Sequence, residues 1–132
     1  TRFLRFGMVV QAYSDAHQQA TSAALLTAGD AVIAVSHTGA TIELLDTVRT
    51  ARQAGAAVIV ITSHAHSPLA KLGDVVLHGM GREVHYSSEA VSSRLIHMAI
   101  TDALYTLMAM QSPKEYRCNL QKMRTVIAKK RL

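Results

Sequence analysis

The chain has 132 residues, of which 49% are hydrophobic and 17% are charged, and it contains 7 glycines and 2 prolines. This composition is typical of one globular domain and excludes a disordered or low-complexity chain. No apolar run approaches the roughly 18 residues that a membrane span needs, and the single cysteine, Cys118, excludes an internal disulfide. We therefore expect a single domain without membrane contact in the reducing cytoplasm.

The net charge of +5 comes from the two ends of the chain. Residues 1–5 contain two arginines, and residues 114–132 contain seven basic residues against one acidic residue, whereas residues 6–113 contain five basic and eight acidic residues. The sequence has no tryptophan and few other aromatic residues, so it offers little base-stacking surface. A nucleic-acid-binding role for residues 6–113 is therefore not expected.

Four short apolar segments rich in β-branched residues alternate with segments that have helical patterns. Such apolar runs are typical of strands that are buried on both faces. The expected strands cover residues 8–13, 31–35, 57–61 and 75–77. The β-α-β order requires parallel strands joined by right-handed crossovers. The sequence therefore predicts an α/β domain with a parallel sheet.

Helix-start and helix-end signals lie between and after these strands. Asp15 with Gln18 resembles a capping box, Gly55 occupies the position of a C-terminal glycine, and Ser67 precedes a proline that can start a short helix. The expected helices cover residues 15–26, 41–54, a short stretch after residue 67, residues 89–110 and residues 112–130. Residues 3–7 resemble the end of a further helix.

The segment after the second expected strand has the residue types of an anion site. Residues 36–41 read SHTGAT and open a helix, so hydroxyls, a glycine and free N–H groups at a positive helix end occur together. N-capping by one hydroxyl would explain Thr38, but it would not explain three hydroxyls around a glycine. We expect Ser36, Thr38, Gly39 and Thr41 to bind a phosphate, in a motif that is neither a P-loop nor a dinucleotide fingerprint.

Several motifs together resemble the sugar isomerase (SIS) domain. They are SHTGAT itself after GDAVIAV at 29–35, AGA at 54–56, IT at 61–62, and SPLA at 67–70 followed by GD at 73–74. The segment SSR at 92–94 before TDALY at 101–105, with the basic last helix, resembles the effector domain of RpiR-type transcriptional regulators. The resemblance implies a flavodoxin-like, three-layer αβα sandwich that binds phosphosugars and usually dimerises.

The resemblance also implies that the chain is incomplete at its N-terminus. SIS domains have an earlier strand that ends in a Gly-x-Gly-x-Ser loop, and the regulators have a helix-turn-helix domain before it; neither pattern occurs in this sequence. We interpret residues 1–132 as a single SIS domain that lacks its first strand, in which residues 1–7 end a preceding helix and residues 112–132 form the basic C-terminal helix. DNA would be bound only through the absent domain.

Two further residues are expected to face the sugar. His17 belongs to an Asp-x-His pattern of the family at a helix N-terminus, which would keep the imidazole neutral, although a surface histidine is the alternative. Glu89 lies where similar regulators place a sugar-facing carboxylate, although charge complementarity with the helix N-terminus also explains it. Neither carboxylates nor cysteines flank the histidines at ligand spacing, so we expect no metal and no cofactor. Those histidines are at positions 64, 66, 78 and 85.

Two functions are compatible with this interpretation. The first is a phosphosugar-binding sensor domain of a bacterial transcriptional regulator, which couples ligand occupancy to a DNA-binding domain through a homodimer formed by the apolar faces of the last two helices. The alternative is an aldose–ketose isomerase acting on a sugar phosphate, which needs a base near the C1 and C2 protons. Glu83 could be that base, but Arg94 stands where such isomerases carry a small hydroxyl residue.

Overall fold

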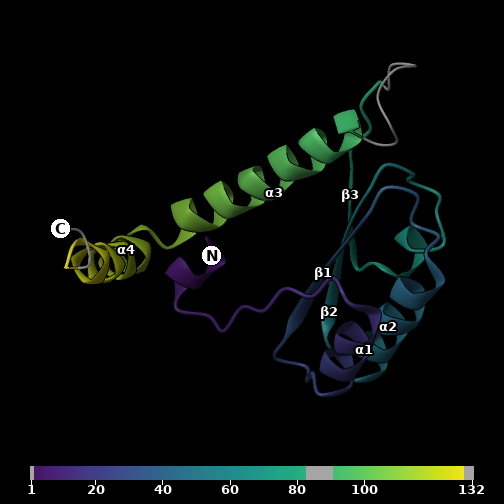
Figure 1. Ribbon diagram of the computed structural model, residues 1–132, viewed down its shortest axis with the longest axis horizontal. Coiled ribbons are helices and arrows are strands. Elements are labelled where there is room, and N and C mark those ends of the chain that lie inside the picture. The colour runs from purple at the N-terminus through teal and green to yellow at the C-terminus, as the bar shows by residue number, and fades with distance from the viewer. Residues whose placement is uncertain (1, 83–90, 130–132) are drawn as a thin grey trace. The chain divides into compact units, whose positions relative to one another are not determined.

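The computed structural model describes residues 2–82 and 91–129 (Figure 1). They belong to two compact units, and each is described by itself. Tyr13–Ile100 form the sheet unit, and the described residues of Thr1–Ala12 and Thr101–Leu132 form the helical unit.

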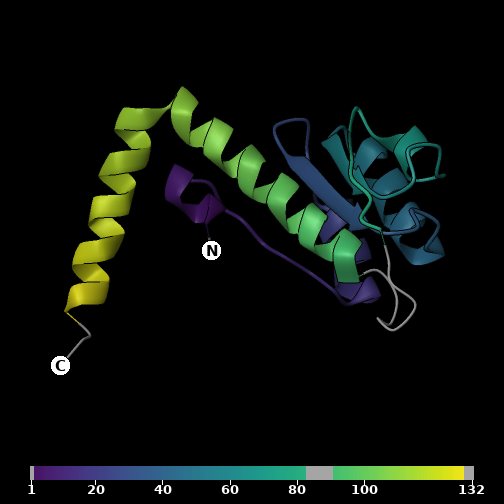
Figure 2. The same cartoon turned by 90° about the horizontal axis from the view of Figure 1, so that it is seen from above.

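The sheet unit contains three parallel strands in the order β1-β2-β3 (Figure 2). Along the chain its elements are α1 (Ala16–Ala24), β1 (Ala31–Ser36), α2 (Ile42–Gln53), β2 (Ala57–Thr62), the 3-10 turn η2 (Ala70–Leu72), β3 (Val75–His78) and the first part of α3 (Val91–Gln111). Ala31 pairs with Ala57, and Ile59 pairs with Val75. The predicted α/β class and parallel sheet are confirmed.

The prediction of a strand over residues 8–13 is wrong. This segment has neither helical nor strand structure, Val9 is 92% exposed, and the sheet of the described residues consists of β1, β2 and β3. Residues 8–12 also belong to the helical unit rather than to the unit that contains β1. An apolar run becomes a strand only where a neighbouring strand forms backbone hydrogen bonds with it. The composition of the run does not show whether such a neighbour is present.

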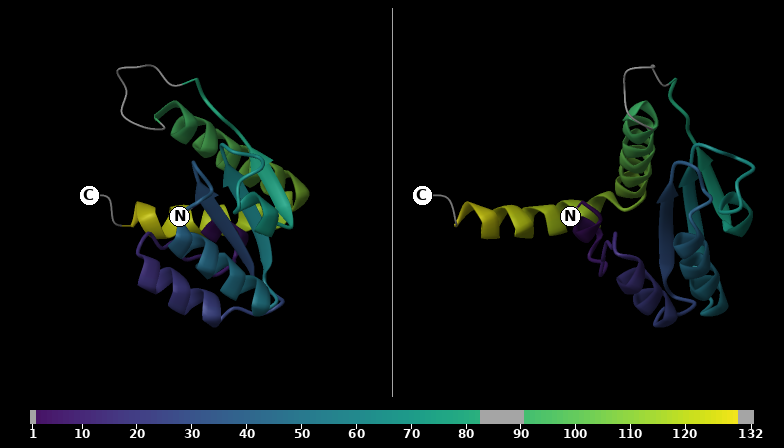
Figure 3. Two further views of the ribbon diagram at one scale, coloured as in Figure 1. Left: turned by 90° about the vertical axis from the view of Figure 1, so that its right-hand side faces the viewer. Right: turned by 45° about the vertical axis from the view of Figure 1, so that its right-hand side comes forward.

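Helices α1 and α2 lie side by side (Figure 3). Their small and apolar residues pack towards the sheet. Ala23 of α1 packs with Ala51 of α2, and Val32 of β1 contacts this cluster. A second cluster is formed by alternate residues of the strands together with α2 and Leu69: Ala34, Leu45, Val48, Val58, Val60 and Leu69. Burial of each of the larger side chains stabilises the fold by about 1.5–3 kcal/mol. This core fixes the strand ends on which the candidate site is built.

The predicted helix boundaries depend on local hydrogen bonds that the structure contains. The carboxylate of Asp15 accepts a hydrogen bond from the Gln18 N–H at 2.9 Å and begins α1. Gly55 follows α2 with a φ of 90°, as predicted for the glycine after a helix. The helix predicted after Ser67 is only the single turn η2, in which the Ser67 Oγ accepts from the Ala70 N–H at 3.2 Å.

Asp74 gives the GD motif a structural role. Its Oδ2 accepts from the Val58 N–H at 2.7 Å, and its own N–H donates to the Val58 carbonyl at 2.8 Å. These two bonds lie directly before the first paired residues of β2 and β3, Ile59 and Val75. Asp74 therefore fixes the register of β3 on β2.

The helical unit contains the 3-10 helix η1 (Phe3–Phe6), residues 101–111 of α3, and α4 (Pro113–Ala128). The ring of Phe6 lies 5.4 Å from that of Tyr105 and 5.7 Å from that of Tyr116. The Arg5 Nη1 donates to the Tyr105 hydroxyl at 2.9 Å, which lies 2.7 Å from the Tyr116 hydroxyl. This aromatic cluster holds η1 against α4. Within the described ranges, no helix combines the length and hydrophobicity of a membrane span.

The turn between β1 and α2 requires a glycine. Gly39 has a φ of 62° and is buried, and a Cβ atom at this position would lie 2.2 Å from the Ser67 Oγ. The Gly39 N–H donates to the Ser36 Oγ at 3.1 Å, and its carbonyl accepts from the Leu69 N–H at 2.9 Å. The backbone of this turn therefore packs against residues 67–69 so closely that no side chain fits at position 39.

We predict that Gly39→Ala lowers the free energy of unfolding by more than Gly55→Ala does. Both residues have a positive φ, so both substitutions cost about 1–2 kcal/mol in backbone strain. At Gly55 a Cβ would meet its nearest atom at 3.5 Å, an ordinary contact, so only the alanine at position 39 adds a clash. Urea unfolding followed by circular dichroism measures both losses. Equal losses would contradict the requirement for close approach at Gly39.

Candidate functional site

The carboxyl ends of the three strands lie at one edge of the sheet, where open α/β sheets bind their ligands. The loop 36–41 after β1 contacts the segment after β2 at this edge. The Ser63 N–H donates to the His37 carbonyl at 3.1 Å. The segment after β3 joins at the same edge, because the Gly79 N–H donates to the Thr62 carbonyl at 3.1 Å. The predicted loop is therefore part of a connected set of strand ends.

The hydroxyls of this loop are arranged so that they can donate to an anion. The Ser36 Oγ accepts from the Gly39 N–H at 3.1 Å, and the Thr38 Oγ1 accepts from the Ala40 N–H at 3.3 Å. A hydroxyl has one proton and two acceptor positions, so both groups keep their O–H for a further partner. Thr41 is the N-cap residue of α2, and its side chain makes no capping hydrogen bond.

The start of α2 adds backbone donors to these hydroxyls. The first N–H groups of a helix have no partner within the helix, and this end of the helix carries a partial positive charge. In α2 the Leu45 N–H is bonded to the Thr41 carbonyl at 3.0 Å, which leaves the N–H groups of residues 42–44 at the helix end. Residues 36–41 contain neither lysine nor arginine. These six residues would therefore hold an anion by directional hydrogen bonds and the helix dipole.

The structure places His17 in the first turn of α1 with an exposed side chain. Asp15, its partner in the Asp-x-His pattern, caps the helix. The backbone carbonyl of His17 accepts from the Thr21 hydroxyl at 2.7 Å. Helix α1 leads into the start of β1, so its C-terminus lies at the amino end of that strand. The N-terminus of α1 therefore lies at the carboxyl edge of the sheet, as the loop 36–41 does. The hydrogen bonds of the described residues do not join the His17 side chain to that loop.

The remaining candidates divide between described and undescribed residues. Glu89 lies outside the described residues, as do Glu83 and His85. Ser93 is buried in α3, and its Oγ accepts from the Gly81 N–H at 3.3 Å, so part of the SSR motif is structural. Arg94 is exposed. Within the ranges that the structure describes, no group of three metal-ligating side chains is present.

A buried hydrogen-bond cluster contains His37, Ser63 and His97, which were not predicted as site residues from the sequence. Ser63 and His97 are separated by 34 residues, and their side chains lie 3.0 Å apart. Burial lowers the pKa of His97 below its ordinary value. The available sequence signal was the spacing of Ser93 and His97, which puts both on one face of α3.

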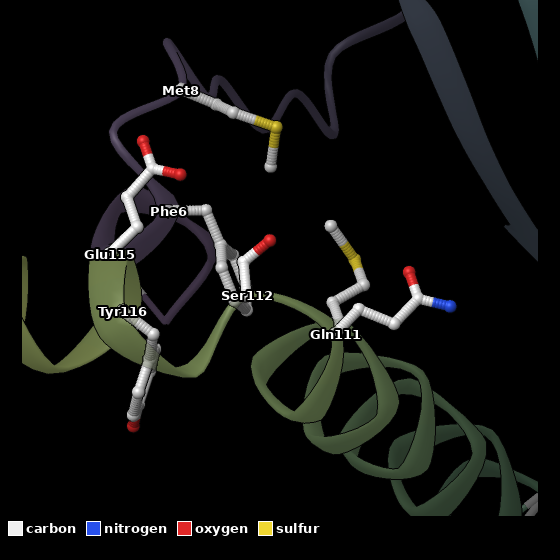
Figure 4. Close-up of a pocket in the computed structure, with 7 residues that line it drawn as sticks. Phe6, Met8, Gln111, Ser112, Glu115 and Tyr116 are labelled. Atoms are coloured by element: carbon white, nitrogen blue, oxygen red, sulfur yellow. The ribbon is translucent and has the colours of Figure 1, made fainter.

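Two surface hollows lie within the helical unit. One, of about 310 Å³, is lined by Lys122, Met123, Val126 and Ile127 of α4. The other, of about 200 Å³, is lined by Phe6 and Met8 together with residues of α3 and α4 (Figure 4). Neither hollow includes a predicted site residue.

Known proteins resemble this chain over most of its length. A model of the SIS domain matches residues 1–107. The HTH-type transcriptional regulator RpiR of Escherichia coli K12 is 35% identical over 126 residues, which are 96% of this chain and 43% of that protein. The bifunctional protein glk of Paraburkholderia xenovorans is 45% identical over 103 residues, which are 78% of this chain and 16% of that protein. The chain thus spans less than half the length of these relatives.

Solved structures agree with the sequence match. The Vibrio vulnificus NanR protein complexed with ManNAc-6P is 27% identical with a TM-score of 0.87, over 98% of this chain and 49% of that chain. The sugar isomerase domain of an RpiR transcription factor from Sphaerobacter thermophilus is 20% identical with a TM-score of 0.73, over 94% of this chain and 68% of that chain, and supports the fold. On the match to residues 1–107 and this shared fold, the chain belongs to the SIS domain family.

Proposed function

We propose that this chain is the phosphosugar-sensing domain of a bacterial transcriptional regulator. The observation that carries the proposal is the loop 36–41, which collects three hydroxyls and the N-terminus of α2 at the carboxyl edge of the sheet. The similarity of the chain to the RpiR regulator and to NanR, which was solved with ManNAc-6P, supports the same function. A regulator of this kind acts in the cytoplasm and contacts DNA through a separate domain.

In the proposed complex, the phosphate accepts hydrogen bonds from the hydroxyls of Ser36, Thr38 and Thr41 and from the N–H groups that begin α2. Gly39 lets the backbone approach, because it has no side chain. His17 and Glu89 are proposed to contact the sugar, His17 from the exposed first turn of α1. Hydrogen bonds between neutral donors and a charged phosphate contribute about 1.5–3 kcal/mol each. In this proposal the loop anchors the phosphate through several such hydrogen bonds.

We predict that Thr38→Val weakens the binding of ManNAc-6P about tenfold or more, because one hydrogen bond to a charged group is lost. Isothermal titration calorimetry measures the affinity. Thr50→Val is the matched control, because the Thr50 hydroxyl donates to the Asp46 carbonyl within α2 and not to the loop. An unchanged affinity in Thr38→Val, with wild-type binding present, would refute the assignment of the loop.

Signalling by this domain is proposed to depend on a homodimer. None of the residues of α4 is buried, although the helix has an apolar stripe that lines the hollow around Met123 and Ile127. An isolated helix of this length is marginally stable in water, so the stripe needs a partner surface. A second copy of the chain would supply one, and a ligand that favours one dimer arrangement by about 1–3 kcal/mol would suffice for regulation.

We predict that Ile127→Glu dissociates the dimer into single chains in sedimentation velocity at micromolar concentration. Ile127 is 52% exposed in the single chain, so the substitution places a charge in the interface without disturbing the monomer. Thr125→Glu is the matched control, because it adds the same charge in the same turn of α4 on the other side of the helix. A wild-type protein that sediments as a monomer would contradict the dimer.

We also propose that the bound phosphosugar is not isomerised. Isomerisation requires a base within about 2.6–3.2 Å of the proton that it removes. Among the described histidines, His97 is buried and bonded to the Gly79 carbonyl at 3.1 Å, which suits a structural role. The similarity of 96% of this chain to the HTH-type transcriptional regulator RpiR of Escherichia coli supports a sensor rather than an isomerase.

The corresponding prediction is that no solvent deuterium enters C1 or C2 of any sugar phosphate that binds, because His17 and Glu89 are proposed to form hydrogen bonds with the sugar and not to remove its protons. Proton NMR of the sugar phosphate in D₂O with the protein present measures the exchange. Exchange that requires the protein and disappears in Glu83→Gln or Glu89→Gln would instead establish an isomerase.

A further inference from the structure

The carboxyl ends of β2 and β3 contain a buried hydrogen-bond cluster that the proposed phosphate contacts do not use. Its centre is the hydroxyl of Ser63, a residue that is 1% exposed. The Ser63 Oγ lies 2.9 Å from the His37 Nδ1, 3.0 Å from the His97 Nε2 and 3.1 Å from the Gly79 carbonyl oxygen. One hydroxyl thus joins the loop after β1, the segment after β3, and α3.

The positions of the protons in this cluster follow from which groups can donate. The His97 Nε2 lies 3.1 Å from the Gly79 carbonyl, which can only accept, so this nitrogen carries a proton. The His78 Nε2, 2.9 Å from the Ser63 carbonyl, carries a proton for the same reason. The Ser63 hydroxyl can donate to the Gly79 carbonyl while it accepts from the His37 Nδ1–H. Removal of the Ser63 hydroxyl would therefore leave the half-buried ring of His37 and the buried groups of Gly79 and His97 without this partner.

His37 connects this cluster to the proposed phosphate loop. Its ring contacts Ser63, and its backbone carbonyl accepts from the Ser63 N–H at 3.1 Å and from the Thr62 hydroxyl at 3.3 Å. Ser36 and Thr38, the neighbours of His37 in the chain, supply two of the proposed phosphate donors. The ring and the carbonyl of His37 together set the position of these hydroxyls relative to β2.

The surroundings of His97 favour its neutral form. His97 is 5% exposed, and its burial is the main cause of its lowered pKa. Within the described residues, His37 from the loop and His78 from β3 lower this pKa further by their charge. The ring of His64, after β2, lies 5.4 Å from that of His37. The cluster therefore acts through the geometry of its hydrogen bonds.

We propose that Ser63 and His97 are positioning residues for phosphosugar binding, which hold the phosphate loop through His37 and couple its occupancy to the position of α3. Neither residue touches the ligand. This inference rests on the proposed function, because it assumes that the loop 36–41 binds the phosphate. It predicts that binding depends on buried hydrogen bonds on the far side of His37 from the ligand.

The test is calorimetric titration of the protein with ManNAc-6P and with inorganic phosphate, in wild type and in Ser63→Ala, His97→Leu and His97→Gln. We expect Ser63→Ala and His97→Leu to weaken binding about tenfold, the size of one lost hydrogen bond to a well-placed group. His97→Gln should bind nearly as well as the wild type, since glutamine keeps an N–H donor. Rescue by glutamine separates the loss of the donor from a general loss of packing.

A double-mutant cycle completes the experiment. If Ser63 acts by positioning Thr38, Thr38→Val should weaken binding less in the Ser63→Ala background than in the wild type. Wild-type affinity in a folded Ser63→Ala protein, failure of glutamine to rescue at position 97, or effects that multiply independently would overturn the inference. If the wild type binds neither probe, or if Thr38→Val alone has no effect on binding, the result refutes the proposed function itself, on which this inference rests. Thermal unfolding without ligand shows which variants are folded.

Discussion

The contact between Gly39 and Ser67 is the constraint on which the candidate site depends. The chain leaves β1, turns through a left-handed glycine that has no room for a Cβ, and enters α2 within a few residues. This tight turn brings three hydroxyls close to the N-terminus of α2. They belong to Ser36, Thr38 and Thr41. A longer or looser connection would separate the hydroxyls from the helix N-terminus, and a phosphate would then contact one of them at a time.

The sequence was sufficient to predict the elements whose signals are local. Strands β1, β2 and β3, the cap at Asp15 and the glycine after α2 each depend on residues within a few positions of one another. The same reasoning placed the loop 36–41 at the end of β1 and the start of α2. It failed for residues 8–13, where an apolar run has no strand beside it, and it overestimated the helix after Ser67, where a single turn forms.

The parts that could not be predicted depend on contacts between residues distant in the sequence. The Ser63 hydroxyl contacts His37, 26 positions earlier, and His97, 34 positions later. No local sequence pattern specifies such contacts. Asp74 was part of a motif that carried the family resemblance, but its bonds to Val58 show a role in strand register. A family motif can thus mix residues that hold the fold with residues that are proposed to hold the ligand.

The measurement that tests the central claim most directly is a crystal structure of this protein with ManNAc-6P bound. The account predicts that the phosphate oxygens lie within hydrogen-bond distance, about 2.7–3.2 Å, of the hydroxyls of Ser36, Thr38 and Thr41 and of the N–H groups that begin α2. The sugar would then extend along the edge of the sheet. A ligand bound at another place on the molecule, with the loop 36–41 making no contact to its phosphate, would contradict the account.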